Sequence, residues 1–176
     1  MPQVLSRPNT LALSRRALRL LIALNLLLGF LILALLVASL VAGDWVMRAL
    51  GVPSNEGSAA LFIGMRLIML VGVVSAPVTH IALTRLLAIV LTVNQGDPFV
   101  AQNATRLQQI AWAVLALELL RLGVGLVEAL VSSPAMPLDL DGSFSPTPWL
   151  AVLLLFVLAR VFDHGTRLRE DLEGTV

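Results

Sequence analysis

The sequence lacks cysteine and lysine and contains few charged residues of any kind. Without cysteine, the chain cannot form disulfides, thiolate metal sites or a cysteine nucleophile. Charged residues make up 13% of the chain, whereas soluble domains carry about 25%. So few charges cannot cover a surface that faces water, and we therefore expect lipid to be the solvent for much of the protein.

Apolar sequence is abundant instead. The chain has 176 residues, of which 58% are hydrophobic, and its mean hydropathy is +0.92. Its 12 basic residues are all arginine, which we interpret as the composition bias of a GC-rich bacterial genome. The net charge of +1 gives no reason to expect direct binding of nucleic acid. The composition predicts a multi-pass protein of the bacterial cytoplasmic (inner) membrane, with the lipid bilayer as its first partner.

Four apolar segments are long enough to cross a bilayer, since about 20 helical residues cross a core of ~30 Å. We expect an all-α fold, a four-helix transmembrane bundle, with cytosolic helix extensions after the second and fourth spans. Pro77 should kink the second span because proline removes a backbone donor and clashes with the preceding turn. Residues 1–176 form a single integral membrane domain with spans at about 17–42, 61–93, 105–131 and 147–165, and a cytosolic tail at 166–176.

The first apolar segment has a competing interpretation as a twin-arginine export signal. Ser14, Arg15 and Arg16, followed by Leu18, loosely fit such a signal. The hydrophobic region of a signal peptide has only about 7–15 residues. This segment is longer and we see no soluble domain after it, so we interpret it as a span.

The arginines predict the orientation, because cytoplasmic loops carry an excess of basic residues. Arg48 and Arg66 lie near the expected outer side, and Arg121 lies inside the third span. The other nine arginines lie at or near the expected inner side, so both termini should be cytoplasmic. These nine are Arg7, Arg15, Arg16, Arg19, Arg85, Arg106, Arg160, Arg167 and Arg169.

Ionisable residues within the spans form a candidate polar cluster: Glu118, Arg121 and Glu128 in the third span, and His80 and Arg85 in the second. The first three fall within an arc of about 80° on one helix face. Ionisable groups inside a membrane cost about 2.5–3.5 kcal/mol each on insertion scales and usually face the bundle interior. Glu118 and Arg121 can pair on one helix. Similar estimated depths predict that Glu118 also contacts Arg85 or His80.

This cluster has a functional and a structural interpretation. It could form an ion or proton pathway, or a proton sensor at His80. It could equally be a polar clamp that fixes the register of the helices. We favour the clamp, because a pathway needs polar residues along its length. The first and fourth spans offer only Asn25 and Ser39 in their apolar parts.

No catalytic motif is visible in the sequence. There is no HExxH, no glycine-rich phosphate loop and no plausible Ser-His-Asp set. The two histidines, His80 and His164, are expected about 20 Å apart in depth, too far to share a metal. We therefore expect no enzyme activity, no metal and no cofactor.

The polar stretch VNQGDPFVAQNATRLQQI, at 93–110, separates the second span from the third. Gly96 suits the end of a helix, and Asp97 and Pro98 suit the start of the next one. The stretch is therefore predicted to be a hinge between two helices, the second beginning at Phe99, with Leu107 on its apolar face. Four residues that the caps do not explain form a candidate partner surface beside the C-terminal tail: Phe99, Gln102, Asn103 and Arg106.

The C-terminal segment is the second distinctive polar region. Asp163 with Arg167, and Arg167 with Asp171, are spaced to form ion pairs on a helix, each worth a few tenths of a kcal/mol. The fourth helix is therefore predicted to continue into the cytosol as a charged extension that ends near Gly174. Its motif residues are Arg167, Leu168, Glu170, Asp171 and Glu173.

Two features carry a resemblance to a known family. The pattern Gly-Asp-Pro-Phe-x-x-x-Asn-x-x-x-Leu at 96–107, placed after the second of four spans, resembles the DUF2975 family of bacterial membrane proteins, and the acidic ending at 168–176 resembles that family's C-terminus. The resemblance implies no catalytic residue, because the family has no established biochemical activity. It does imply a partner, because members are often encoded beside a small helix-turn-helix DNA-binding regulator.

Three functions are compatible with these features. The leading hypothesis is a non-enzymatic, regulatory membrane protein whose cytosolic face binds a soluble partner such as that regulator. The second is a small transporter or channel subunit that uses Glu118, Arg121, His80 and Arg85. The third is a structural or assembly subunit of a membrane complex. The oligomeric state is left open.

Overall fold

The computed structural model describes residues 8–49, 51, 58–96, 100–131 and 145–173. Over these residues the chain is almost entirely helical and contains no strand, which confirms the all-α prediction. The helices are α1 (Pro8–Val41), α2 (Gly43–Ala49), α3 (Ser58–Asn94), α4 (Ala101–Val131) and α5 (Pro146–Glu173). The short helix α2 was not predicted. The predicted helix start at Phe99 lies outside the described residues.

Four of the helices are long and apolar enough to cross a membrane, which indicates a multi-pass membrane protein. The candidate spans are Ala12–Val41, Ala60–Asn94, Ala101–Val131 and Pro146–Arg169. Many large apolar side chains on these helices are exposed, including Phe30, Leu130 and Leu154. Contiguous apolar surface on this scale requires a partner other than water. Lipid is the partner that helices of this length predict.

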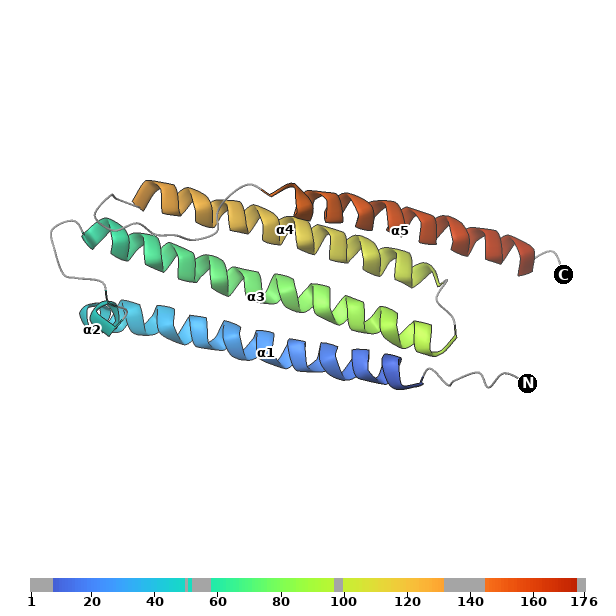
Figure 1. The fold of residues 1–176 in the computed structure, drawn as a ribbon, viewed down its shortest axis with the longest axis horizontal. Coiled ribbons are helices and arrows are strands. Elements are labelled where there is room, and N and C mark those ends of the chain that lie inside the picture. The colour runs from blue at the N-terminus through green and yellow to red at the C-terminus, as the bar shows by residue number, and fades with distance from the viewer. Residues whose placement is uncertain (1–7, 50, 52–57, 97–99, 132–144, 174–176) are drawn as a thin grey trace.

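The long helices lie side by side in the order α1, α3, α4, α5, and each runs antiparallel to its neighbour (Figure 1). The substantial contacts between long helices join α1 to α3, α3 to α4, and α4 to α5. Burial follows this arrangement, because the inner helix α4 has the most buried side chains, whereas α1 buries only Leu18 and Ser39 among its described side chains. The helix row therefore has its main core along α4.

Small residues bring α1 and α3 close together near the middle of the row. A Cβ atom placed on Gly29 would lie 2.7 Å from the Cβ atom of Ala76, and one on Gly72 would lie 3.3 Å from Ile32. Close backbone approach at small residues is a common mode of helix packing in membranes. Here it occurs beside Pro77, through which α3 continues as one helix. The Asn25 amide donates to the Ala76 carbonyl over 2.9 Å and ties α1 to α3 at this proline.

Arg66 of α3 hydrogen-bonds to the last turn of α1. Its Nε donates to the Ser39 hydroxyl (3.0 Å) and its Nη2 to the Ser39 carbonyl (2.6 Å). The last four carbonyls of a helix have no partner within the helix. Arg66 therefore caps α1 from the neighbouring helix, which explains why Ser39 is fully buried in an otherwise exposed span.

Candidate functional site

The ion pair of Glu118 and Arg121 lies within α4, as the spacing predicted. Arg121 donates from Nε to one carboxylate oxygen (3.0 Å) and from Nη2 to the other (2.7 Å). Glu118 is only 5% exposed, so it does not face lipid. A bidentate pair of this kind is geometrically specific and combines two charge-assisted hydrogen bonds. It neutralises both charges on a single helix.

Glu118 does not hydrogen-bond to the neighbouring helix α3, which carries its predicted contacts Arg85 and His80. Its hydrogen bonds to described residues all go to Arg121, not to His80 or Arg85 of α3. Each oxygen of the carboxylate accepts one hydrogen bond from Arg121. Arg85 is exposed, and Glu128 is half-buried. Hydrogen bonds between described residues therefore do not join the five ionisable residues into one network.

His80 occupies a different environment from the other ionisable residues. Its Nδ1 atom is buried and has no hydrogen-bond partner among the described residues. A buried polar atom without a partner is uncommon. His80 lies three residues after Pro77. Among the described members of the predicted cluster, it is the one with a buried nitrogen that lacks a hydrogen-bond partner.

Gly96 ends α3 as predicted. Its φ of +85° lies in the left-handed region, which glycine adopts without a side-chain clash. Its N–H donates to the Val93 carbonyl over 3.1 Å, closing the last turn. Asp97, Pro98 and Phe99 lie outside the described residues, so their capping roles and the place of Phe99 in a partner surface stay predictions.

Asn103 is fully buried, which corrects its place in the predicted partner surface. Its amide nitrogen donates to the Thr92 hydroxyl over 2.8 Å, and its oxygen accepts from Arg106 Nη1 over 2.8 Å. It therefore joins the start of α4 to the end of α3. The physical reason is its helix face: Asn103 shares the buried side of α4 with Leu107 and Ile110.

Gln102 and Arg106 are the two remaining described members of that surface. Arg106 hydrogen-bonds to both Gln102 and Asn103. Arg106 is half-buried, and its Nη2 donates to the oxygen of the exposed Gln102 over 3.1 Å. Neither residue lines the space beside the C-terminal helix. The α4 residues that line this space are Ala104, Thr105 and Gln108, and Trp112 also contacts α5 through Phe156. The sequence does not state the direction from which α5 approaches, so the α4 side of this space could not be predicted from it.

The C-terminal extension is helical through Glu173, as predicted. Arg167 pairs with Asp163 over 2.9 Å. Among the described residues it pairs with this aspartate and not with Asp171, which is also exposed. Leu168 is 53% exposed between charged neighbours. The side chains of Glu170 and Glu173 lie outside the described part of the chain.

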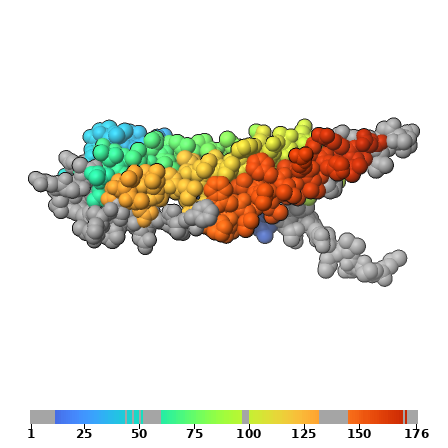
Figure 2. Space-filling view, turned by 90° about the horizontal axis from the view of Figure 1, so that it is seen from above, coloured from blue at the N-terminus to red at the C-terminus, as the bar shows by residue number. Residues whose placement is uncertain are grey.

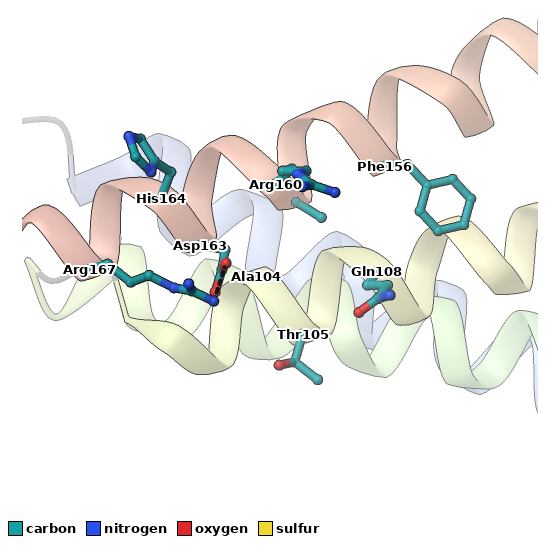
Figure 3. A pocket seen from close by; sticks show the side chains of 9 residues that line it. Ala104, Thr105, Gln108, Phe156, Arg160, Asp163, His164 and Arg167 are labelled. Atoms are coloured by element: carbon teal, nitrogen blue, oxygen red, sulfur yellow. Dashed lines mark ion pairs between the residues drawn. The ribbon is translucent and has the colours of Figure 1, made fainter.

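An open groove of about 700 Å³ lies between the first turns of α4 and the last turns of α5. We call it the α4–α5 groove. Its apolar lining consists of Ala104, Ala159 and Phe156. In Figure 3, Phe156 lies at one end of the groove and the ion pair of Asp163 and Arg167 towards the other. The polar lining residues are Thr105, Gln108, Arg160, Asp163, His164 and Arg167.

Most of these lining residues were not singled out as a site from the sequence. The α5 members stand at positions 160, 163, 164 and 167, the spacing of one helix face. That stripe is visible in the sequence. The matching residues of α4 could not be identified without knowing which face α5 covers.

A family model described as "Protein of unknown function (DUF2975)" matches residues 21–176. No curated protein and no solved structure matches the chain. The matched range includes the Gly-Asp-Pro-Phe pattern and the C-terminal motif from which the resemblance was drawn. It also reaches into all four long helices. Since the match covers most of the chain, the protein belongs to the DUF2975 family.

Proposed function

We propose that the protein is a non-enzymatic regulatory component of the bacterial inner membrane that holds a soluble helix-turn-helix regulator on its cytosolic face. The observation that carries this proposal is the exposed, charged end of α5. It projects beyond the helix row at the end of the molecule where the arginines collect.

The orientation follows from the distribution of charge. We call the arginine-rich end the end at which α1 and α4 begin and α3 and α5 end (Figure 1). At the opposite end lie Arg48 and Arg66, and Arg66 is bonded to Ser39. Basic residues favour the cytoplasmic side, so the arginine-rich end faces the cytosol in this proposal. Its described arginines are Arg15, Arg16, Arg19, Arg85, Arg106, Arg160, Arg167 and Arg169.

The projection of α5 follows from its register with α4. Arg167 lines the groove with Ala104, which lies in the first turn of α4. The last residues of α5 therefore continue beyond the point where α4 begins. Figure 2 shows the red end of α5 reaching further than the other described helices. An exposed helix end that combines Leu168 with charged neighbours offers both apolar and ionic contacts to a partner.

Capture of the regulator tests this proposal. The full-length protein, purified in detergent, should retain a helix-turn-helix regulator encoded beside its gene. Leu168→Asp should abolish the capture, because it places a charge in the apolar part of the proposed contact. Arg48→Glu, at the opposite end, is the control and should leave capture unchanged. Absence of capture by the wild type, with unchanged regulator activity in a deletion strain, would overturn the proposal.

A transporter or channel subunit is the alternative that one observation favours. The buried, unpartnered Nδ1 atom of His80 lies within a span, and such groups often mark ion or proton pathways. The pairing of Glu118 with Arg121 speaks for a structural role of those two residues. Proteoliposomes should then show a proton flux that His80→Ala removes and that Arg16→Gln, at an exposed arginine outside the polar cluster, preserves. The absence of flux under an imposed gradient would exclude this alternative.

A further inference from the structure

The α4–α5 groove has a cation available for an external anion. Asp163 is paired with Arg167 across 2.9 Å, so these two charges offset each other. Arg160 is exposed and makes no hydrogen bond or ion pair with any described residue. His164, also exposed, contributes a further nitrogen donor. The groove therefore carries a net positive charge centred on Arg160.

Neutral donors from the other helix face the same space. Thr105 and Gln108 line the groove from α4, and both are exposed. A hydroxyl and an amide can donate to the oxygens of a bound group. Arginine presents a planar fork of donors that fits phosphate oxygens. The set of donors thus suits an oxyanion with several oxygens, of which phosphate is the common biological case.

The groove continues into apolar surface at one end. Phe156 lines it there and meets Trp112 of α4 edge-to-face, with ring centroids 5.3 Å apart. Trp112 is 57% exposed, so its ring faces the surroundings of the helices. Leu153, one turn earlier on α5, is 61% exposed. A ligand with both an anionic head and apolar chains would contact both parts of this site.

The α4–α5 groove lies at the part of α5 that we expect at the headgroup level of a bilayer. The apolar run of α5 gives way to charge at Arg160, and aromatic rings such as Trp112 favour the interface between lipid and water. Small residues at the base of the groove, Ala104 and Ala159, are both 7% exposed and leave its volume open. Basic pockets between membrane helices suit anionic headgroups on the cytoplasmic side.

We propose that the α4–α5 groove binds an anionic phospholipid, with its phosphate held by Arg160, Thr105 and Gln108 and an acyl chain lying along Phe156 and Trp112. A soluble phosphate compound would leave the aromatic end of the site unused. Phosphatidylglycerol is the probe with the required chemistry. The site requires neither the soluble regulator nor its capture by α5.

Binding is tested with the full-length protein in detergent micelles, titrated with phosphatidylglycerol and followed by native mass spectrometry. The wild type should bind one phosphatidylglycerol in preference to phosphatidylcholine. Arg160→Gln should weaken that binding about tenfold, the loss expected for a charge-assisted contact. Arg160→Lys should restore part of it, and Thr105→Val should weaken it less than Arg160→Gln.

Arg16→Gln is the matched control, because Arg16 is an exposed arginine at the same end of the molecule but on α1. It should leave binding unchanged. Equal weakening by Arg16→Gln and Arg160→Gln would show general attraction to charge and would overturn the proposed site. Full displacement of the lipid by millimolar inorganic phosphate would show that the groove recognises a free anion and would also overturn it. Helical content by circular dichroism confirms that each variant is folded.

Discussion

The interface of α1 with α3 and the interface of α4 with α5 both join two long antiparallel helices, but different kinds of residue form them. Between α1 and α3 the backbones come so close that Gly29 has no room for a side chain beside Ala76. The polar donors there, Asn25 and Arg66, are directed at backbone carbonyls of the opposite helix. This interface is tightly packed, and both of these donors have partners.

Between α4 and α5, large aromatic rings are in contact in one part of the interface, and a groove separates the helices in another part. Trp112 and Phe156 meet edge-to-face, and nearer the arginine-rich end the helices leave the α4–α5 groove. Arg160 lines this groove and is exposed, whereas Arg167 pairs with Asp163 on the same helix. In the α1–α3 interface, small residues on both helices allow the backbones to pack closely. In the α4–α5 interface, small residues lie beside long charged side chains, and a groove remains between the helices. Four experiments test this difference.

The largest effect is expected at the closest approach of α1 and α3. Gly29→Leu should lower the free energy of unfolding by about 3 kcal/mol, because a side chain there meets Ala76 and overpacking costs about 1–3 kcal/mol. Thermal unfolding in detergent, followed by circular dichroism, measures the change. Gly123→Leu on α4 is the control, since a Cβ atom there has nothing within 4 Å. Equal destabilisation by both variants would contradict the close-packing interpretation.

A smaller loss is expected when the cap on α1 is removed. Arg66→Ala frees the Ser39 carbonyl and hydroxyl. Hydrogen bonds to charged groups contribute about 1.5–3 kcal/mol, and because Arg66 is half-buried we expect about 1.5 kcal/mol. Chemical unfolding in mixed detergent provides the measurement. Arg85→Ala, an exposed position on the same helix, should change stability far less; a similar loss there would refute the capping role.

The aromatic contact of α4 and α5 should contribute less than either. Aromatic pairs are worth about 0.5–1.5 kcal/mol beyond the area that they bury, and Trp112 is already 57% exposed. A double-mutant cycle with Trp112→Ala and Phe156→Ala should therefore give a coupling energy of about 1 kcal/mol or less. A coupling as large as the Gly29→Leu effect would show that the two interfaces are equally tight.

The smallest effect on stability is expected at the exposed pair of α5. Arg167 and Asp163 are 72% and 50% exposed, and such pairs contribute about 0–1 kcal/mol. Asp163→Asn should thus leave thermal unfolding almost unchanged. It should instead strengthen phosphatidylglycerol binding, because it leaves Arg167 without its carboxylate beside the groove. Weaker lipid binding by this variant would contradict the charge balance that we assign to the groove.

The fold was largely predictable because its main signals are local. Long apolar segments indicate spans, and Gly96 marks the end of α3 because its conformation suits glycine. The pairing of Glu118 with Arg121 was also predictable, since residues three apart meet on any helix. Each of these features depends on neighbours within a few residues.

The candidate site was less predictable because it depends on helix rotation. The periodicity of α4 showed that Asn103 and Leu107 share a face, yet Asn103 was assigned to an exposed surface although it is fully buried. The Thr92 hydroxyl of α3 supplies the partner that makes its burial acceptable. Nothing in the local sequence identifies that partner. The short helix α2 was not predicted either.

The sequence by itself determined that the chain is a four-span membrane protein, because apolar length and helical spacing are properties of each segment alone. It also determined where charge gathers along the chain. Only the tertiary structure decided which residues face one another: Asn103 towards α3, Thr105 and Gln108 towards α5, and Arg66 towards the end of α1. The physical reason is that the spacing of residues in a helix determines which of them share a face, whereas the packing of all four helices determines which neighbour covers that face.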